Sequence, residues 1–394
     1  MAEKKYNFDS EINRRGTGAL KYDALEERYG YKDLFPLWVA DMDFAVCPEI
    51  TESLIKRLQH PVYGYAQTPQ SYWNSIINWV KRHFDLNVSR EELTYIPGIV
   101  KGIAYAVNYF TAKGDKILIQ QPVYHPFRFV IEGNGRTLVS SPLKRTDAGY
   151  DPDLKRLEET VTAEKPKMMI LCNPHNPGGT RWSKEQLAEI ARIANENGMI
   201  VLSDEIHADI ILDGTVHNTY FSAGKNAEET GIVFGAPSKT FNIAGLVSSW
   251  AIIKNERLRK DFYAWLDANE FNDPTFISTI ATEEAYNNGE EWLKEMIEYI
   301  NGNIEAADNY LTEYIPQIKV VKPQASFLVW LDCRELDLTQ KELVSLFTEK
   351  AGLALNDGEM FGKEGVGYMR MNIGTTRANL MKSLEKLRNA VNSL

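Results

Sequence analysis

The chain has 394 residues, of which 44% are hydrophobic and 25% are charged, a composition typical of soluble globular proteins of two or three domains. Its net charge of −10 argues against nucleic acid or an anionic membrane as the main partner. No apolar run approaches the roughly 18 residues of a membrane span, and the first ten residues lack the apolar stretch of a secretory signal. The three dispersed cysteines, Cys47, Cys172 and Cys333, lack zinc-ligand spacing. We therefore expect reduced thiols in a cytoplasmic protein, with no metal site.

Residues 1–50 show little periodicity and are expected to form an irregular N-terminal arm. From about residue 51 onward, helices and strands are expected to alternate. Apolar residues at helical spacing predict helices over residues 51–59, 71–84, 98–112 and 183–197. Ser183 is the expected N-cap of the last of these helices, and Gln186 completes its capping box.

Short apolar runs predict strands over residues 116–120, 167–172, 199–203 and 231–235, with a second strand pair over 245–253. Near-continuous apolar strands that alternate with helices are typical of a buried, mostly parallel sheet.

The pattern changes beyond about residue 280. One long helix is expected over 283–310, strands over 326–331 and 367–373, and a closing helix over 377–392. The sequence thus predicts an α/β fold of two domains. Residues 51–280 form a large domain with the mostly parallel sheet, residues 281–394 form a smaller α+β domain, and the arm 1–50 packs with the small domain.

Polar residues follow three of the predicted strands, at the ends where open α/β sheets bind ligands. They are Asn176 after the second strand, Asp204 and His207 after the third, and Ser238 and Lys239 after the fourth. Each has an ordinary structural explanation as well: a turn for the asparagine, a helix cap for the aspartate, a packed histidine and a surface lysine. Three such strand ends in one sheet favour a ligand site.

A lysine and an aspartate at the ends of neighbouring strands can hold an aromatic cofactor between them. The pairing indicates pyridoxal phosphate (PLP), with Lys239 as the Schiff-base lysine and Asp204 as the carboxylate that keeps the pyridine nitrogen protonated. Tyr124 follows another predicted strand and either packs in the ordinary way or stacks on the ring.

Two further groups complete the expected site. Gly98, Ile99 and Val100 open a predicted helix, where free backbone N–H groups bind phosphate well, and Ser238 can add a hydroxyl. Arg370 lies in an alternating strand and either faces solvent or holds a substrate carboxylate in its planar fork. The carboxylates of Asp41 and Asp43 lie in a turn-like stretch without further ligands at metal-binding spacing.

The residues in this order resemble those of the fold-type-I PLP enzymes of aminotransferase classes I and II, and the resemblance covers most of the chain. The residues on which the resemblance rests are Tyr65, Gly98, Ile99, Val100, Tyr124, Asn176, Asp204, Lys239 and Arg370. Four stretches are similar to the MalY/PatB group of cystathionine β-lyases and cysteine C–S lyases: ADMDF at 40–44, NPHNP at 173–177, SDEIH at 203–207 and APSKTFNIAG at 236–245.

The resemblance implies a role for each residue around the cofactor. Lys239 is expected to anchor it and to act as acid and base, and Asp204 to pair with its pyridine nitrogen. Asn176 is expected to bond the 3′-oxygen with His207 nearby, and Tyr124 to stack on the ring. The phosphate is expected to lie on Gly98, Ile99, Val100 and Ser238.

The resemblance also implies the substrate contacts and the assembly. Arg370 is expected to bind the substrate carboxylate, with Ala40, Tyr124 and Asn176 beside the substrate. Tyr65, counted with Lys239 and Asp204 among the catalytic residues, is expected to reach the cofactor phosphate of a neighbouring subunit. The expected assembly is therefore a homodimer with shared sites.

The chain departs from the broader class at the phosphate. Aspartate-type aminotransferases carry an arginine eight residues after the lysine, where this chain has Val247, and often a serine three residues before it, where this chain has Ala236. The MalY-like group also lacks the arginine, so this departure favours that group.

We therefore expect α,β-elimination of L-cystathionine or another L-cysteine S-conjugate to a thiol, pyruvate and ammonia. An aminotransferase acting on an amino acid and a 2-oxo acid uses the same lysine, aspartate and arginine and remains an open alternative. A PLP-binding regulatory protein would keep the fold and bind the cofactor without turnover.

Overall fold

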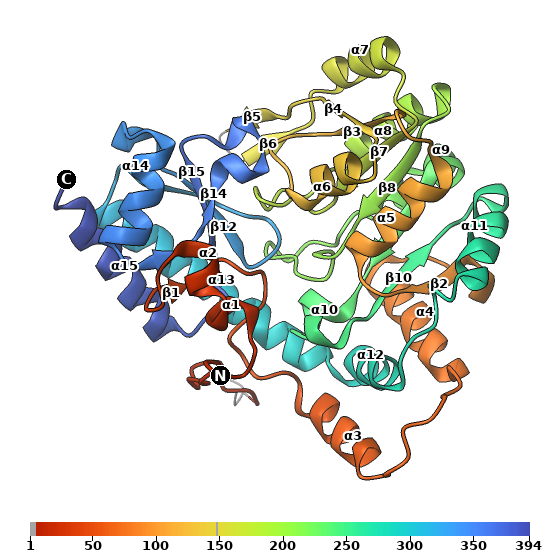
Figure 1. The fold of residues 1–394 in the computed structure, drawn as a ribbon, viewed down its shortest axis with the longest axis horizontal. Helices are drawn as coiled ribbons and strands as arrows, with labels where there is room; N and C mark the ends of the chain where they lie inside the picture. The colour runs from red at the N-terminus through yellow and green to blue at the C-terminus, as the bar shows by residue number, and fades with distance from the viewer. Residues whose placement is uncertain (1–4, 147–148) are drawn as a thin grey trace.

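The computed structural model describes residues 5–146 and 149–394, so the first four residues of the predicted arm lie outside the described part. A seven-stranded sheet runs through the larger part of the molecule (Figure 1). Its strands, in spatial order, are β2 (Leu93–Ile96), β10 (Ser249–Ile252), β9 (Gly231–Gly235), β8 (Ile200–Asp204), β7 (Met168–Cys172), β3 (Lys116–Ile119) and β4 (Thr137–Ser140). Only β10 runs antiparallel to its neighbours, so the predicted mostly parallel sheet is confirmed.

Both faces of the central strands are buried, which explains why β7 and β9 consist of apolar residues and glycine. In β7, Met169 and Leu171 pack into one core cluster, whereas Ile170 packs into the other. Three helices contribute to the second cluster: α5 (Ile99–Phe110), α6 (Pro126–Gly133) and α11 (Glu256–Ala268). The helices that contribute to the first cluster include α4 (Gln70–Phe84), α7 (Leu154–Glu164), α8 (Lys184–Glu196), α9 (Lys225–Thr230) and α12 (Phe276–Asn288).

The predicted helix starts of this region are largely confirmed. Ser183 caps α8, and the reciprocal capping box with Gln186 is present. The helix predicted over 51–59 is α3 (Pro48–Leu58), which packs against α12. A small hairpin, β5 (Lys144–Thr146) and β6 (Gly149–Asp151), lies outside the main sheet.

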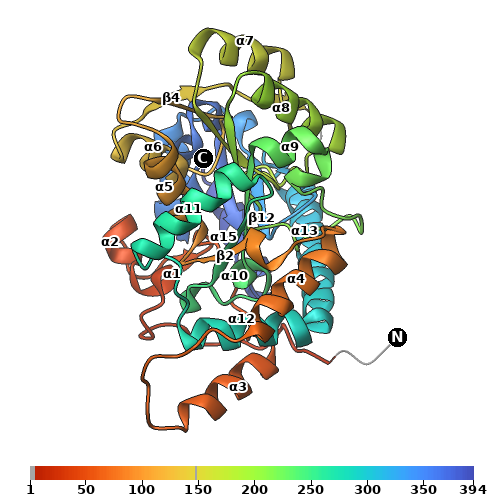
Figure 2. The ribbon, with the colours of Figure 1, turned by 90° about the vertical axis from the view of Figure 1, so that its right-hand side faces the viewer.

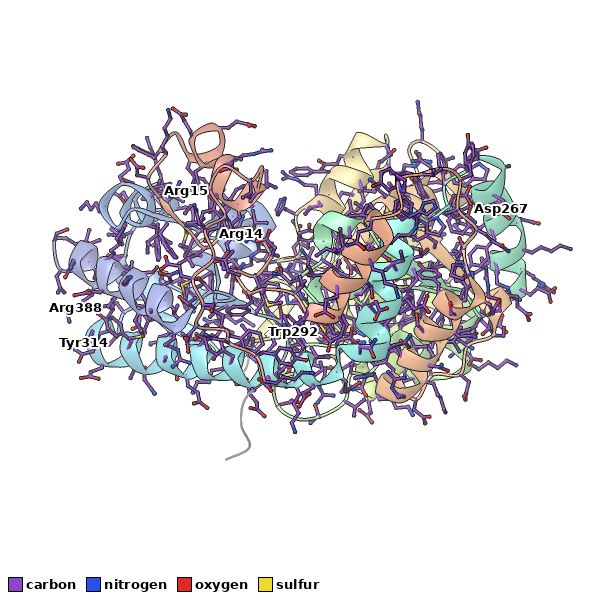
Figure 3. The ribbon with its side chains drawn as sticks, turned by 90° about the horizontal axis from the view of Figure 1, so that it is seen from below. Arg14, Arg15, Asp267, Trp292, Tyr314 and Arg388 are labelled. Atoms are coloured by element: carbon purple, nitrogen blue, oxygen red, sulfur yellow. The ribbon has the colours of Figure 1, made fainter. Side chains whose placement is uncertain are left out.

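A second, antiparallel sheet forms the smaller part of the molecule. Its order is β11 (Lys319–Val321), β12 (Leu328–Asp332), β15 (Tyr368–Asn372) and β14 (Asn356–Asp357). The helices α13 (Glu290–Tyr314), α14 (Gln340–Ser345) and α15 (Arg377–Val391) accompany it. In Figure 3, α13 runs from Trp292, near the middle of the molecule, to Tyr314 under the smaller part. We propose that the domains divide close to the start of this helix.

The single helix predicted over residues 283–310 is wrong. The chain forms two helices instead, α12 and α13, which are separated at Gly289. A Cβ at residue 289 would lie 2.3 Å from the Phe241 ring and 2.5 Å from the Ala285 carbonyl oxygen. Only glycine therefore allows the chain to pass this close to the segment that follows Lys239. Figure 2 shows that α12 and α13 run in different directions.

Two other predictions need correction. Residues 245–253 hold one strand, β10, because the chain before it forms a 3-10 turn, Ala244–Leu246, that ends at Val247 in the left-handed region. The N-terminal arm is less irregular than predicted, since it contains α1 (Leu20–Asp23), α2 (Leu25–Tyr29) and β1 (Phe35–Pro36). Strand β1 pairs with β13 (Leu353–Ala354), which joins the arm to the C-terminal part of the chain.

No helix in the described part of the chain combines the length and apolar character needed to cross a membrane.

Candidate active site

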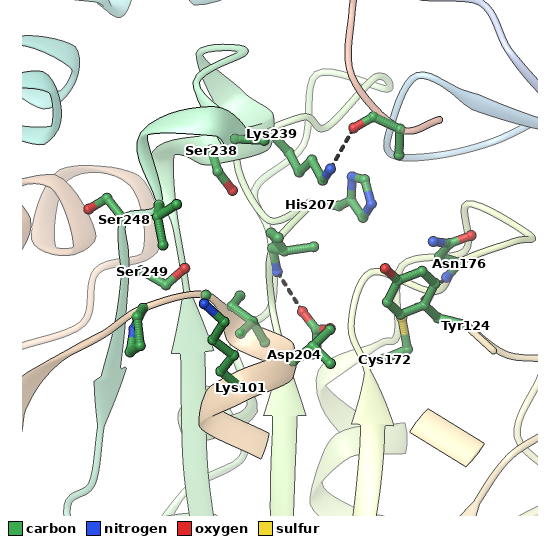
Figure 4. A pocket seen from close by; sticks show the side chains of 18 residues that line it. Lys101, Tyr124, Cys172, Asn176, Asp204, His207, Ser238, Lys239, Ser248 and Ser249 are labelled. Carbon is green, nitrogen blue, oxygen red and sulfur yellow. Dashed lines mark hydrogen bonds between the residues drawn. The ribbon is translucent and has the colours of Figure 1, made fainter. Parts of the chain in front are cut away.

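The polar ends of β7, β8 and β9 lie side by side in the sheet and surround a cavity of about 310 Å³ (Figure 4). This volume lies in the range of small-molecule sites. All residues of the predicted site line the cavity except Tyr65 and Arg370. The lining members are Ala40, Gly98, Ile99, Val100, Tyr124, Asn176, Asp204, His207, Ser238 and Lys239.

Lys239 enters the cavity from α10 (Pro237–Thr240), a single turn that follows β9. Its Nζ donates a hydrogen bond to the Ala40 carbonyl oxygen, 2.5 Å away. Burial lowers the pKa of Lys239 to about 8, although the carboxylates of Asp41 and Asp204 act in the opposite direction. An amine with this pKa is partly neutral near pH 7, so it can act as a nucleophile or as a base.

Asp204 is the last residue of β8 and is 4% exposed. Its Oδ1 accepts the Ile206 N–H at 3.1 Å, so the capping-type bond considered from the sequence is present. Its other oxygen makes no hydrogen bond to any residue that the structure describes, and the side chain lines the cavity. Burial raises the pKa of Asp204 to about 7. A cationic group in the cavity would stabilise the ionised carboxylate, as a protonated pyridine nitrogen does.

Arg370 reaches the same region from β15 of the second sheet and is 3% exposed. Its Nη1 donates to Asn176 Oδ1 at 3.0 Å, and its Nη2 donates to the Trp38 carbonyl oxygen at 3.0 Å and to Asn356 Oδ1 at 2.6 Å. Its Nε has no partner among the described residues. Burial lowers the pKa of Arg370 to about 10, so the guanidinium stays charged at neutral pH and can receive a carboxylate.

His207 and Tyr124 provide the less polar walls of the cavity. His207 is 3% exposed, and burial, together with the positive charges of Lys239 and Arg370, lowers its pKa to about 3. It is therefore neutral, and its Nδ1 has no hydrogen-bond partner in the described part of the chain. Tyr124 is half-buried and packs edge-on against Phe127, with the ring centroids 5.6 Å apart.

A segment of the N-terminal arm, residues 38–44, crosses the site as a strap. Its Trp38 carbonyl receives Arg370 and its Ala40 carbonyl receives Lys239, as described above. Two asparagine side chains hold it in place, the buried Asn372 and the half-buried Asn242. Asn372 donates to the Val39 and Asp41 carbonyls at 2.6 and 2.7 Å, and Asn242 donates to the Met42 and Phe44 carbonyls at 2.9 Å each.

The two carboxylates of the strap, which the sequence left without a role, bind cations of the same arm. Arg14 lies 2.8 Å from both Asp41 and Asp43, and the fully buried Lys21 lies 3.0 Å from Asp43. Sequence reasoning missed these partners because nothing in the pattern links residues 14 and 21 to residues 41 and 43.

The predicted phosphate end lies at the start of α5. Gly98 is the N-cap, with a φ of 109° that glycine adopts without strain, and the first-turn residues Ile99 and Val100 line the cavity. Sequence reasoning missed several lining residues: Pro97, Lys101, Cys172, Ile206, Ala244, Val247, Ser248 and Ser249. Lys101 directly follows the predicted phosphate-binding residues in the sequence, whereas Ser249 comes into place only because β10 pairs with β2, opposite Ile96.

Tyr65 does not reach the cavity of its own chain. It lies in the loop between α3 and α4 with its side chain fully exposed. In Figure 2, α3 and this loop project from the rest of the molecule.

The cavity fits pyridoxal phosphate in its chemistry. Lys239 can hold the aldehyde carbon, the free oxygen of Asp204 suits a protonated ring nitrogen, and the N–H groups at the start of α5 suit a phosphate. The Nδ2 of Asn176 makes no hydrogen bond to the described residues, so it is available for the ring oxygen. Arg370 then offers a second anion site for a substrate.

Comparisons with known proteins agree with this chemistry. The sequence model of the family "Aminotransferase class I and II" matches residues 32–387. The chain is 38% identical to cystathionine beta-lyase PatB of Bacillus subtilis over 385 residues, which cover 98% of this chain and all of the relative.

Solved structures give the same picture. A PLP-bound candidate aminotransferase from Clostridium difficile superimposes with a TM-score of 0.95 at 40% identity, covering 98% of this chain and 100% of the other. A PLP-bound C–S lyase from Staphylococcus hominis superimposes with a TM-score of 0.91 at 33% identity, covering 98% of both chains.

Proposed function

The chain belongs to the aminotransferase class I and II family, and from this premise we propose that it is a PLP-dependent carbon–sulfur lyase. It eliminates the β-substituent of L-cystathionine or another L-cysteine S-conjugate and, with the consumption of one water molecule, releases a thiol, pyruvate and ammonia. The observation that carries the proposal is that Lys239 and Asp204 line one cavity together with Asn176, whose side chain is bonded to Arg370, in a chain 38% identical to a cystathionine β-lyase.

When bound, the cofactor supplies an electron sink for the negative charge that develops at the substrate Cα. Asp204 supports this sink through its buried carboxylate, whose free oxygen faces the cavity. Because burial alone favours the protonated acid, the carboxylate ionises fully only against a cation, and the two charges stabilise each other.

Lys239 moves the protons of the reaction. Its amine, with a pKa of about 8, accepts the proton from the substrate Cα as a general base. It then returns a proton to the departing sulfur as a general acid, so the thiol leaves in neutral form. The Ala40 carbonyl, 2.5 Å from Nζ, keeps the amine inside the cavity during these transfers.

Arg370 and Asn176 orient the substrate. The guanidinium holds the α-carboxylate, and its bonds to Asn176, Asn356 and the Trp38 carbonyl fix its plane before the substrate arrives. The strap carries both the Trp38 and the Ala40 carbonyls, so one segment of the arm positions the carboxylate holder and the proton carrier together.

The same residues would serve an aminotransferase, so the two activities are separated by products. Incubating the purified holoenzyme with L-cystathionine or S-methylcysteine should give pyruvate and a thiol, and Lys239→Ala should abolish both this turnover and the visible absorbance of lysine-bound cofactor. Formation of glutamate from an amino acid and 2-oxoglutarate, without pyruvate from the cysteine conjugates, would replace the lyase with the aminotransferase. Cofactor binding without either turnover would favour a regulatory protein.

We also propose that the enzyme is a homodimer with shared sites and works in the cytoplasm. The exposed Tyr65, in a loop that projects from the chain, supports a role at a neighbouring subunit. The cytoplasmic assignment is supported by the three cysteines, which are all buried free thiols.

A further inference from the structure

The cofactor phosphate would meet few cationic side chains in this protein. A phosphate monoester carries between one and two negative charges at neutral pH. Val247 stands where the broader class has an arginine, and Ala236 replaces a frequent serine. The backbone N–H groups of Ile99 and Val100 can donate hydrogen bonds but do not add a full positive charge, and the Gly98 N–H already donates to the Ile96 carbonyl oxygen.

Among the residues that the structure describes, Lys101 is the one cation that lines the cavity at this end. Of the lining side chains in the described structure, only Lys101, Lys239 and His207 can carry positive charge. His207 is kept neutral because its surroundings lower its pKa. Lys239 is bonded to the Ala40 carbonyl oxygen, at the end of the cavity where we propose that the reaction takes place. The Lys101 ammonium forms no ion pair with a described residue, unlike Lys116 at the start of β3, which pairs with Glu164.

The position of Lys101 in its helix is unfavourable in the absence of an anion. It lies in the first turn of α5, which contains no acidic residue, and the N-terminus of a helix carries partial positive charge. A cation there is destabilising by itself. A phosphate bound between the helix start and the ammonium would turn this repulsion into two favourable interactions.

Two buried hydroxyls face the same space. Ser238 is 8% exposed and Ser249 is 2% exposed, both line the cavity, and neither hydroxyl bonds a described residue. Ser248, by contrast, is engaged by Thr282 at 2.6 Å. In Figure 4 the Lys101 amine points to the region where the hydroxyls of Ser238 and Ser249 also point. Ser249 is placed there by the pairing of β10 with β2.

We infer that Lys101 binds the cofactor phosphate, with Ser249 as an added hydroxyl donor, and takes the place of the missing arginine. This inference rests on the proposed function, because it assigns residues to the cofactor of that reaction. A lysine acts here as a flexible point charge, which suits a phosphate already oriented by helix N–H groups.

The test measures the dissociation constants of PLP and of pyridoxal, which lacks the phosphate, for the cofactor-free protein. Lys101→Ala should weaken PLP about tenfold, since a charge-assisted hydrogen bond is lost, and leave pyridoxal within about twofold. Lys101→Arg should recover most of the PLP affinity. The PLP affinity of the wild type should also fall more steeply with salt than that of Lys101→Ala.

Lys113→Ala is the matched control, since it removes an exposed lysine just beyond the other end of α5 and should change neither constant. Thermal unfolding of the cofactor-free variants verifies that they are folded. Equal PLP affinity in wild type and Lys101→Ala would overturn the inference, and so would equal losses for PLP and pyridoxal. If the wild type turns over cysteine conjugates in either case, the proposed function stands. A wild type that binds no PLP would overturn both.

Discussion

At the scale of single residues, the site depends on groups that are costly to bury without their ligand. Asp204 and Lys239 both have pKa values displaced by burial toward their neutral forms, to about 7 and about 8. Arg370 keeps its charge but leaves Nε without a partner in the described structure. Such groups are retained at the expense of stability because they match the charges of the cofactor and the substrate.

Asp204 should therefore make the stability of the cofactor-free protein depend on pH. Its folded pKa of about 7 exceeds the unfolded value of 3.8, so the native state holds more protons between these values. Its contribution is complete below about pH 4 and is lost as the pH rises through 7. Over this range the free energy of unfolding should fall by about 3 kcal/mol more in the wild type than in Asp204→Asn.

Denaturant unfolding of both cofactor-free proteins at pH 4.5–7.5 measures this difference, and parallel curves would contradict it. Added PLP should remove most of the decline in the wild type, because a protonated pyridine nitrogen beside Asp204 favours the ionised carboxylate.

At the scale of elements, segments far apart in sequence position the catalytic groups. The strap 38–44 is held by Asn242 and Asn372, and its carbonyls bind Lys239 and Arg370. The break between α12 and α13 lets Gly289 contact Phe241, two residues after Lys239. These contacts fix the end of α10, whose single turn has little stability of its own.

Gly289→Ala should destabilise the protein by about 1–3 kcal/mol, because the new methyl group overlaps the Phe241 ring and the Ala285 carbonyl. Gly133→Ala, at the exposed end of α6, is the control. It meets no atom within 4 Å and should leave stability unchanged or raise it by up to about 1 kcal/mol. Chemical denaturation compares the two, and equal stability of both variants would show that the helix break does not need glycine.

At the scale of the whole molecule, each active site of the proposed dimer contains residues from both chains. Tyr65 is fully exposed in a projecting loop, and its hydroxyl makes no hydrogen bond to the residues that the structure describes. If Tyr65 serves the partner's cofactor, then Tyr65 and Lys239 of one site come from different subunits.

Complementation between two inactive variants tests this arrangement. Tyr65→Ala and Lys239→Ala should each be nearly inactive, whereas a co-expressed mixture should recover about a quarter of wild-type activity. Half of the dimers are then hybrids, and each hybrid has one intact site out of two. Light scattering should give twice the chain mass, and mixed dimers without recovered activity would contradict sharing of Tyr65.

Much of the site could be predicted from the sequence because it lies at strand ends. Parallel strands bring their carboxyl ends to one edge of the sheet. Asn176, Asp204 and Lys239 therefore come together there, whatever the exact packing of the helices. Local patterns likewise predicted the capping box of α8 and the glycine start of α5. These features depend on neighbouring residues or on a general rule of sheet topology.

Only the tertiary structure revealed the contacts between segments that lie far apart in the sequence. Arg14 and Lys21 pair with carboxylates of the strap that are remote in the sequence. Ser249 lies opposite Ile96 because two remote strands pair. The division of the predicted long helix at Gly289 rests on a steric contact with Phe241. The periodicity of the sequence does not predict such contacts, because they are fixed by packing in three dimensions. The sequence by itself therefore determined the chemistry of the site. The fold decided which backbone carbonyls bind Lys239 and Arg370, and which cations pair with the carboxylates of the strap.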